Sequence, residues 1–222
     1  MTDADRLASL HWGIVGKAAP LPGDRDRIFR IDGPGGERWV LKVALDSPGE
    51  RQGHRSQREV LELLHGAWPG GDAPFPRVVD PTGAGPLVEP DGAGRACLVR
   101  LVDFVPGTPL ALVRRRPDGL YRGVGRLLGR MDRILGEAPE ALGDRELDWD
   151  LRSARAQIER HHSRIPAPDR RALLDRLVSR WDERGAHVAA ALPTALIHSD
   201  ANDHNVLVDL GVGSTPAERA PR

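Results

Sequence analysis

The stretch HSDANDHNVLV, residues 198–208, begins with polar side chains and ends in an apolar run. Asp200 and Asn205 stand five positions apart, so a loop of this length can turn both side chains into one cleft. Phosphoryl transfer needs a carboxylate that orients the substrate hydroxyl and an amide oxygen on the metal ion that neutralises the phosphates. Asp and Asn are also common turn formers, so a plain polar turn is the alternative interpretation.

The residues upstream of this stretch, from about 105 onward, are predicted to be mainly helical. The segment VPGTPLA, residues 105–111, interrupts the chain with Pro106, Gly107 and Pro109 and predicts a hinge. Apolar residues at helix spacing then predict a helix over 121–138. Two more helices are expected at about 151–163 and 168–191.

The first hundred residues predict a mostly antiparallel sheet with one helix inserted after its first hairpin. The hairpin consists of RIFRID and ERWVLKVAL, which alternate around the turn GPGG. The expected order begins with a short helix over 3–14, strands over 27–32 and 37–45, and a helix over 54–65. A strand over 74–80 follows, and residues 85–105 are expected to form two strands joined by the turn DGAG.

Composition excludes several classes of function. The chain has 222 residues, enough for one large domain or two small lobes, and its net charge of zero favours neither nucleic acid nor an anionic membrane as a partner. No apolar run approaches the about 20 residues of a membrane span. The N-terminus lacks a signal-peptide core, and the one cysteine, Cys97, suits a reducing compartment. We therefore expect a cytoplasmic protein.

Lysine is scarce: of the 32 basic residues only Lys17 and Lys42 are lysines. In an arginine-rich chain, a lysine that remains can mark a site that needs a compact ammonium group, although a lysine that reaches from a strand into solvent is the alternative. The phosphate-binding motif G-x-x-x-x-G-K-[ST] does not occur, and no G-x-G-x-x-G opens a helix after a strand.

The pattern H-x-D-x-x-x-x-N followed by apolar residues resembles the catalytic loop of the aminoglycoside phosphotransferase and choline kinase superfamily. The wording DANDHNVLV is most similar to its hydroxylysine-kinase-like branch, some members of which are fused to class III aminotransferases. Four more segments resemble the family's nucleotide-loop strand, lysine strand, inter-lobe hinge and a helix start: GDRDRIFRID, WVLKV, LVRLVDFVPGTPL and RELDWDL (145–151). The resemblance extends over about residues 5–209.

The resemblance implies an α/β, protein-kinase-like fold of two lobes. The expected N-lobe, residues 1–104, is an antiparallel sheet with a helix and binds the nucleotide. The expected C-lobe, residues 105–209, is mainly helical, carries the catalytic loop and is incomplete, and residues 210–222 are expected to be a disordered tail. Fusion or association with a class III aminotransferase is a further implication.

The resemblance also assigns roles around the catalytic loop. Asp200 would be the catalytic base, His198 would brace the loop, and Asn205 would be a ligand of Mg²⁺. Ser199 stands where glycine is commoner in the family.

In the N-lobe, Lys42 would contact the α and β phosphates of ATP and Glu59 would pair with it, with Glu62 or Gln57 as alternative partners. The hinge backbone would hold the adenine edge, and Phe104 or a neighbouring residue would pack on the ring. The hinge residues are Val102, Asp103, Phe104 and Val105. Ile28 replaces the asparagine usual in the nucleotide loop, which puts one polar contact in doubt.

The resemblance also implies a second magnesium-binding aspartate, at the end of a hairpin that follows Asn205. Asp209-Leu210-Gly211 mimics that motif, but it lies only four residues after Asn205 and fits the start of the hairpin turn better. We therefore expect a truncated, possibly frame-shifted chain whose strand after Asn205 lacks its partner and whose phosphoryl transfer is impaired.

The implied function is ATP-dependent phosphorylation of a small-molecule hydroxyl, on a hydroxylated amino acid or an aminoglycoside. A non-catalytic nucleotide-binding module or pseudokinase is the first alternative. The second is a metal-dependent hydrolase built on histidines and carboxylates of the same region: His198, Asp200, Asp203 and His204, with His161 and His162.

Overall fold

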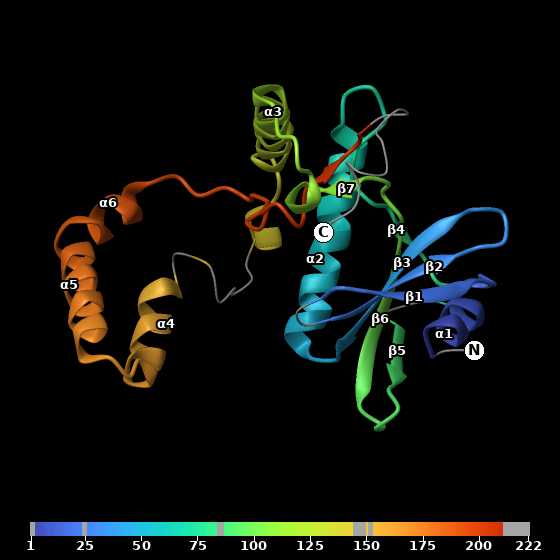
Figure 1. The fold of residues 1–222 in the computed structure, drawn as a ribbon, viewed down its shortest axis with the longest axis horizontal. Helices are drawn as coiled ribbons and strands as arrows, with labels where there is room; N and C mark the ends of the chain where they lie inside the picture. The colour runs from blue at the N-terminus through green and yellow to red at the C-terminus, as the bar shows by residue number, and fades with distance from the viewer. Residues whose placement is uncertain (1–2, 24–25, 84–86, 144–149, 151–152, 211–222) are drawn as a thin grey trace.

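The computed structural model describes residues 3–23, 26–83, 87–143, 150 and 153–210 (Figure 1). The first part of the chain forms an antiparallel sheet with a helix on either side. Its elements are α1 (Asp3–Trp12), β1 (Lys17–Leu21), β2 (Arg27–Asp32), β3 (Arg38–Leu45), α2 (Pro48–Ala67), β4 (Val78–Val79), β5 (Leu87–Pro90) and β6 (Ala96–Asp103).

The strand order in this sheet is β1-β2-β3-β6-β4, with β5 also paired to β6, and every pair is antiparallel. The predicted hairpin is β2 and β3. Strand β1 was not predicted, because KAAPL contains a proline and lacks an apolar alternation. An edge strand tolerates the proline, since only one side of it needs backbone hydrogen bonds.

Side-chain alternation gives the sheet two different faces. One face packs on α1 through a cluster that includes Leu7, Ile31, Leu41 and Leu101, each at most 6% exposed. The other face carries Lys42 of β3 and Arg100 of β6 and lies toward α2, where Gln57 contacts Arg100. The predicted functional lysine therefore lies on the α2 side of the sheet.

Helix α2 begins earlier than the apolar spacing predicted. Ser47 caps it by accepting a hydrogen bond from the Glu50 N–H at 3.1 Å, and Pro48 occupies its first turn. The polar first turns carry no apolar stripe, so periodicity alone placed the start at residue 54.

The second part of the chain is mainly helical. Its elements are β7 (Thr108–Pro109), a 3₁₀ turn η1 (Leu110–Leu112), α3 (Asp118–Leu135), η2 (Glu140–Gly143), α4 (Ala154–His161), η4 (His162–Arg164), α5 (Pro168–Arg184), α6 (Ala186–Ala191) and β8 (Leu207–Val208). Helices α4 and α5 form a hairpin (Figure 1), held by Arg155 with Asp182 and by His162 with Asp175.

The single helix predicted over 168–191 is two helices, α5 and α6, which meet at Gly185. A Cβ atom built on Gly185 would lie 2.4 Å from the Trp181 ring, so the ring occupies the space of a side chain at this joint. The apolar pattern runs through the joint unchanged, which is why the sequence predicted one helix.

Helix α2 connects the two parts, because Leu64 in the helix and Trp68 just after its end form a cluster with Met131 and Leu135 of α3. Within the second part, strand β8 pairs with β7, with Thr108 opposite Val208. The prediction that the strand after Asn205 lacks a partner is therefore wrong, because the hinge segment itself supplies one.

Several predicted features lie outside the described residues: all of RELDWDL except Asp150, and the tail from residue 211 onward. No helix in the described part of the chain is long and apolar enough to cross a membrane.

Candidate functional site

The loop before β8 brings Asp200 and Asn205 into direct contact. The Asn205 side-chain N–H donates to the Asp200 backbone carbonyl and to Asp200 Oδ2, both at 2.8 Å. Both side chains are exposed, so a ligand can reach them. The two residues that the spacing placed in one cleft are thus neighbours in space.

These contacts set the orientation of the Asn205 amide. Its nitrogen faces two acceptors on Asp200, and among the described residues no hydrogen bond uses its oxygen. An amide oxygen is the atom with which asparagine binds hard cations. Among the described residues, Asn205 therefore presents an amide oxygen without a hydrogen bond beside a carboxylate.

Asn202 organises this loop and was missed by the sequence analysis. Its side-chain N–H donates to Asp200 Oδ1 at 2.7 Å, while its Oδ1 accepts from the N–H groups of His204 and Asn205 at 2.9 and 3.2 Å. The sequence did contain a signal for this role. An asparagine in a turn commonly accepts a hydrogen bond from the backbone two residues ahead, and Asn202 lies within the predicted loop.

His198 lies at the start of the loop, where its Nδ1 accepts from the Asp200 N–H at 3.3 Å. With Nδ1 as the acceptor, Nε2 is the ring nitrogen left to donate. Between them, Ser199 has a φ of +62°, a left-handed conformation that glycine adopts more easily. This explains the glycine preference noted at this position.

Backbone bonds anchor the loop to η1. The Leu110 N–H donates to the Val206 carbonyl and the Ala111 N–H to the Asp203 carbonyl, each at 2.8 Å. Val206 is buried with Leu110 and Val113 in a small apolar cluster. The loop is therefore exposed at its polar tip and fixed at its base.

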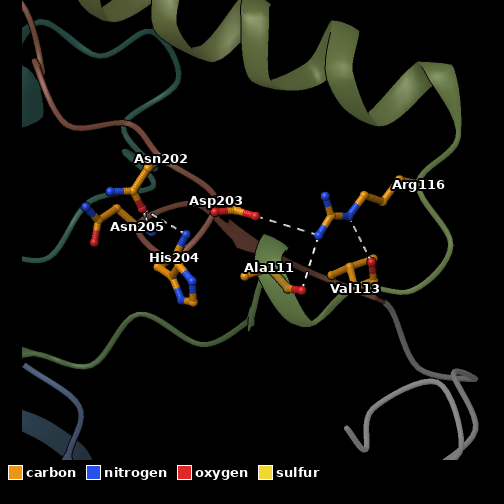
Figure 2. A network of polar contacts seen from close by, with 7 residues as sticks. All are labelled: Ala111, Val113, Arg116, Asn202, Asp203, His204 and Asn205. Atoms are coloured by element: carbon orange, nitrogen blue, oxygen red, sulfur yellow. Dashed lines mark hydrogen bonds and ion pairs between the residues drawn. The ribbon is translucent and has the colours of Figure 1, made fainter. Parts of the chain in front are cut away.

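Arg116 adds a side-chain clamp to the same anchor (Figure 2). Its guanidinium donates to the carbonyls of Val113 and Ala111, at 3.0 and 3.2 Å, and lies 3.8 Å from Asp203 Oδ2. The sequence contained no signal for this role, because Arg116 is the last of three successive arginines.

Lys42 lies in the middle of β3, between Ile28 of β2 and Arg100 of β6. Burial and the nearby Arg100 lower the pKa of Lys42, whereas Asp26 acts in the opposite direction. Within the described residues, Lys42 forms no ion pair. Its ammonium is thus partly buried and available to an anion.

Helix α2 does not bring a carboxylate to Lys42 in the described structure. Glu59 is exposed and forms no ion pair with it, and Glu62 lies 3.6 Å from Arg58 instead. Gln57 accepts a 2.5 Å hydrogen bond from Arg100. Of the three candidate partners of Lys42, Gln57 is therefore the one that contacts Arg100, the residue opposite Lys42 in the sheet.

In the hinge, most N–H groups are already used. Val102 pairs with both Val40 and Val78, the Asp103 N–H donates to the Arg77 carbonyl, and the Phe104 N–H donates to the Arg38 carbonyl. Among the described residues, no hydrogen bond uses the Val105 N–H.

The Phe104 ring is covered on one side, because the Arg38 guanidinium lies 4.4 Å from its centroid. The Asp103 carboxylate is also engaged, because its Oδ1 accepts from the Arg77 backbone N–H at 2.5 Å.

Two cavities lie away from this loop, one lined mainly by residues of α1, β5 and β6 and the other by residues of α2 and β4. Across the described ranges, no group of three or more His, Cys, Asp or Glu side chains is placed to hold a metal ion. This finding gives the metal-dependent hydrolase no support.

An antiparallel sheet with a partly buried lysine, joined to a helical part that carries an Asp–Asn loop, places the chain among protein-kinase-like folds. A model of the phosphotransferase enzyme family matches residues 17–216, and the chain belongs to that family.

The curated relatives are hydroxylysine kinases. The chain is 26% identical to that of Mus musculus, over 88% of this chain and 55% of that protein, and 25% identical to that of Bos taurus, over 92% and 57%. These matches confirm the resemblance to the hydroxylysine-kinase-like branch. The chain spans just over half the length of the curated relatives it matches.

Solved structures confirm the fold. A GDP complex of an aminoglycoside 2'-phosphotransferase superposes with a TM-score of 0.62 at 18% identity, over 95% of this chain and 67% of that one. The amicoumacin kinase hAmiN, in complex with AMP-PNP, Ca²⁺ and its ligand, gives 0.57 at 14%, over 85% and 53%. The predicted α/β, protein-kinase-like architecture is therefore correct.

Proposed function

We propose that this chain carries the nucleotide site and the catalytic loop of an ATP-dependent phosphotransferase that acts on a small-molecule hydroxyl group. The observation that carries the proposal is the direct contact of Asp200 with Asn205 at 2.8 Å in an exposed loop. A carboxylate beside a free amide oxygen is the pair that phosphoryl transfer needs.

In this proposal Asp200 orients the acceptor hydroxyl and accepts its proton. Asn202 and Asn205 each donate to one of its carboxylate oxygens, which fixes the orientation of the carboxylate. His198 and Asn202 act on the loop geometry through the contacts described above.

The donor chemistry of Asn205 fits a hard divalent cation, since the free atom is an oxygen. Asn205 Oδ1 would hold Mg²⁺, which when bound neutralises charge on the phosphates. The Ca²⁺ and AMP-PNP named with the amicoumacin kinase support a divalent ion and a nucleoside triphosphate as ligands here.

Lys42 would bind the phosphates as a compact positive charge. The Val105 N–H, which no hydrogen bond uses among the described residues, would donate to the adenine edge, and backbone carbonyl groups of Val102 to Val105 would accept from it. Glu59 would take part only after a movement of its side chain or of α2, because it is exposed and apart from Lys42.

The acceptor class that we propose is a hydroxylated amino acid of the hydroxylysine type, supported by the names of the relatives. Aminoglycosides are the competing acceptor, supported by the structural neighbours. A cytoplasmic location and a class III aminotransferase partner stay predictions of the sequence.

The proposal is tested by following ADP release and ³¹P NMR with ATP, Mg²⁺ and either 5-hydroxylysine or an aminoglycoside. We expect impaired but measurable transfer by the wild-type chain and a further loss of about 10²–10⁴-fold in Asp200→Asn, because a positioned proton acceptor contributes that much. Asp72→Asn, which alters an exposed loop aspartate outside the site, is the matched control and should retain full activity.

A non-catalytic nucleotide-binding module is the second candidate. It is favoured because, among the described residues, we assign a single protein ligand to the metal ion, the amide oxygen of Asn205. It predicts that ATP raises the melting temperature while no phosphorylated product forms. Absence of both binding and transfer would overturn both candidates.

A further inference from the structure

A second partly buried cation lies directly across the sheet from Lys42. Arg100 of β6 is the register partner of Lys42 in β3. Directly opposed residues point to the same face and have Cβ atoms about 4.5–5.5 Å apart. The face that carries the predicted phosphate-binding lysine therefore carries two positive charges.

Arg100 is held by groups from two other segments. One of its terminal nitrogens donates to Asp26 at 3.1 Å, just before β2, and the other donates to Gln57 of α2 at 2.5 Å. The side chains of Arg100 and Asp26 are only 17% and 19% exposed. Arg100 thus ties β6, the approach to β2 and helix α2 together around Lys42.

The charges in this cluster do not balance. Asp26 is the carboxylate paired with Arg100, and within the described residues no carboxylate pairs with Lys42. Arg58, the next basic group on α2, is already occupied by Asp80 and Glu62.

His54, one helical turn before Gln57, adds no positive charge. Burial, with Arg100 and Arg58, lowers the pKa of His54, so the ring is neutral at pH 7. Its Nε2 is buried and has no hydrogen-bond partner among the described residues. The unpaired charge at this face is therefore that of Lys42. A partly buried charge without an ion-pair partner is unfavourable, and a bound anion would compensate it.

Resting on the proposed function, we propose that Arg100 is a positioning residue for the polyphosphate of the nucleotide. Through Asp26 and Gln57 it holds the approach to β2 and helix α2 around Lys42, and its own charge makes this face attractive to an anion with several negative charges. The contact between α2 and the lysine's surroundings is then a Gln57–Arg100 hydrogen bond instead of a carboxylate–lysine ion pair.

The test measures binding of ATP, ADP and adenosine by calorimetry to the full chain and its variants. Arg100→Met should weaken ATP binding about tenfold or more, because hydrogen bonds and charges at partly buried sites contribute that much, and should leave adenosine binding unchanged. Arg100→Lys keeps the positive charge but lacks the guanidinium that bonds Asp26 and Gln57 together. It should therefore recover part of the ATP affinity lost in Arg100→Met. Arg55→Met, on the exposed side of α2, is the control and should bind ATP normally.

Gln57→Ala keeps both positive charges and releases one hold on Arg100. We expect a smaller loss that is again confined to the phosphorylated ligands, and this variant serves if Arg100→Met does not fold. Unchanged ATP affinity in Arg100→Met, or in Gln57→Ala where it replaces that variant, would overturn the inference. So would an equal loss for ATP and adenosine, which would indicate a purely structural role.

Failure of the proposed function has a different signature. In that case the wild-type chain itself would bind none of the three ligands, whatever residue stands at position 100.

Discussion

At the scale of single residues, the candidate site combines side chains held in unfavourable surroundings. Lys42 is partly buried without an ion-pair partner in the described structure, and Ser199 adopts a left-handed backbone conformation. Such positions persist when the surrounding structure holds them, and they cluster at sites of function. Substitutions of such residues can therefore separate an effect on stability from an effect on activity.

Lys42→Met should make the free protein about 0.5–2 kcal/mol more stable at pH 7 while abolishing ATP binding, since functional groups are often kept at a cost in stability. The pKa of Lys42 in the folded state lies below its ordinary value of 10.5. Below the folded pKa, both states are protonated and the penalty is fully present. As the pH rises from the folded pKa toward the unfolded one, the penalty disappears.

The measurement is the free energy of unfolding in urea at several pH values between neutral and 10.5. The stability gain of Lys42→Met over wild type should shrink as the pH rises. Lys17→Met, at the exposed end of β1, is the matched control and should show neither effect. A Lys42→Met variant that is less stable than wild type at pH 7 would contradict this interpretation.

At the scale of elements, the catalytic loop depends on a short segment that follows the sheet. Residues 107–116 provide the pairing strand β7, the turn η1 and the Arg116 clamp, and all three contact residues 203–208. A segment that resembles an inter-lobe hinge is therefore also the support of the loop.

Gly107→Ala should separate β7 from β8. Gly107 has a φ of +151°, and a Cβ there would lie 2.9 Å from Leu207 Cβ. We expect a loss of about 1–3 kcal/mol in unfolding free energy, measured by urea denaturation. Gly92→Ala, where no atom lies within 4 Å of the new Cβ and φ is not positive, should change stability by less than about 0.5 kcal/mol.

Arg116→Ala should loosen the loop without unfolding the protein. Removing the clamp leaves the hydrogen bond from the Ala111 N–H to Asp203 less protected, and its amide should exchange about fivefold to tenfold faster. Native-state hydrogen exchange measures this directly. The neighbouring Arg115 is exposed, so Arg115→Ala is the control, and equal exchange rates in the two variants would remove Arg116 from this role.

At the scale of the whole molecule, α2 belongs to both parts of the structure. Its Gln57 contacts the sheet, while Leu64 near its end and Trp68 just after it pack on α3. Trp68 also packs edge-on against Phe75, which follows the helix. A change at the α2–α3 contact should therefore affect how the parts unfold together.

Leu64→Ala should lower the free energy of unfolding by about 2–4 kcal/mol, because Leu64 is only 2% exposed. We also expect the sheet and the helical part to unfold at different urea concentrations, as seen by comparing tryptophan fluorescence with helical circular dichroism. Leu177→Ala on α5, a leucine that is 54% exposed, should cost less than about 0.5 kcal/mol. Coincident transitions in Leu64→Ala would show that another contact couples the two parts.

Patterns with a clear period were predicted correctly. The β2–β3 hairpin and the apolar stripe of α3 follow from alternation and helical spacing, since burial of one face imposes that period. Strand β1, the polar start of α2 and the α5–α6 break lack a periodic signal. Strand β1 depends on its position at the edge of the sheet, the start of α2 on the Ser47 cap, and the α5–α6 break on the Trp181 ring beside Gly185.

By itself, the sequence determined the kind of fold and the proximity of Asp200 to Asn205, because the patterns that predict them lie within short stretches of chain. Only the tertiary structure decided that β8 pairs with the hinge, that Arg116 clamps the loop and that Arg100 lies beside Lys42. These contacts join residues 58 to 100 positions apart in the chain, and no local pattern encodes them. Closing such loops depends on the packing of the whole core, so the structure was needed to find them.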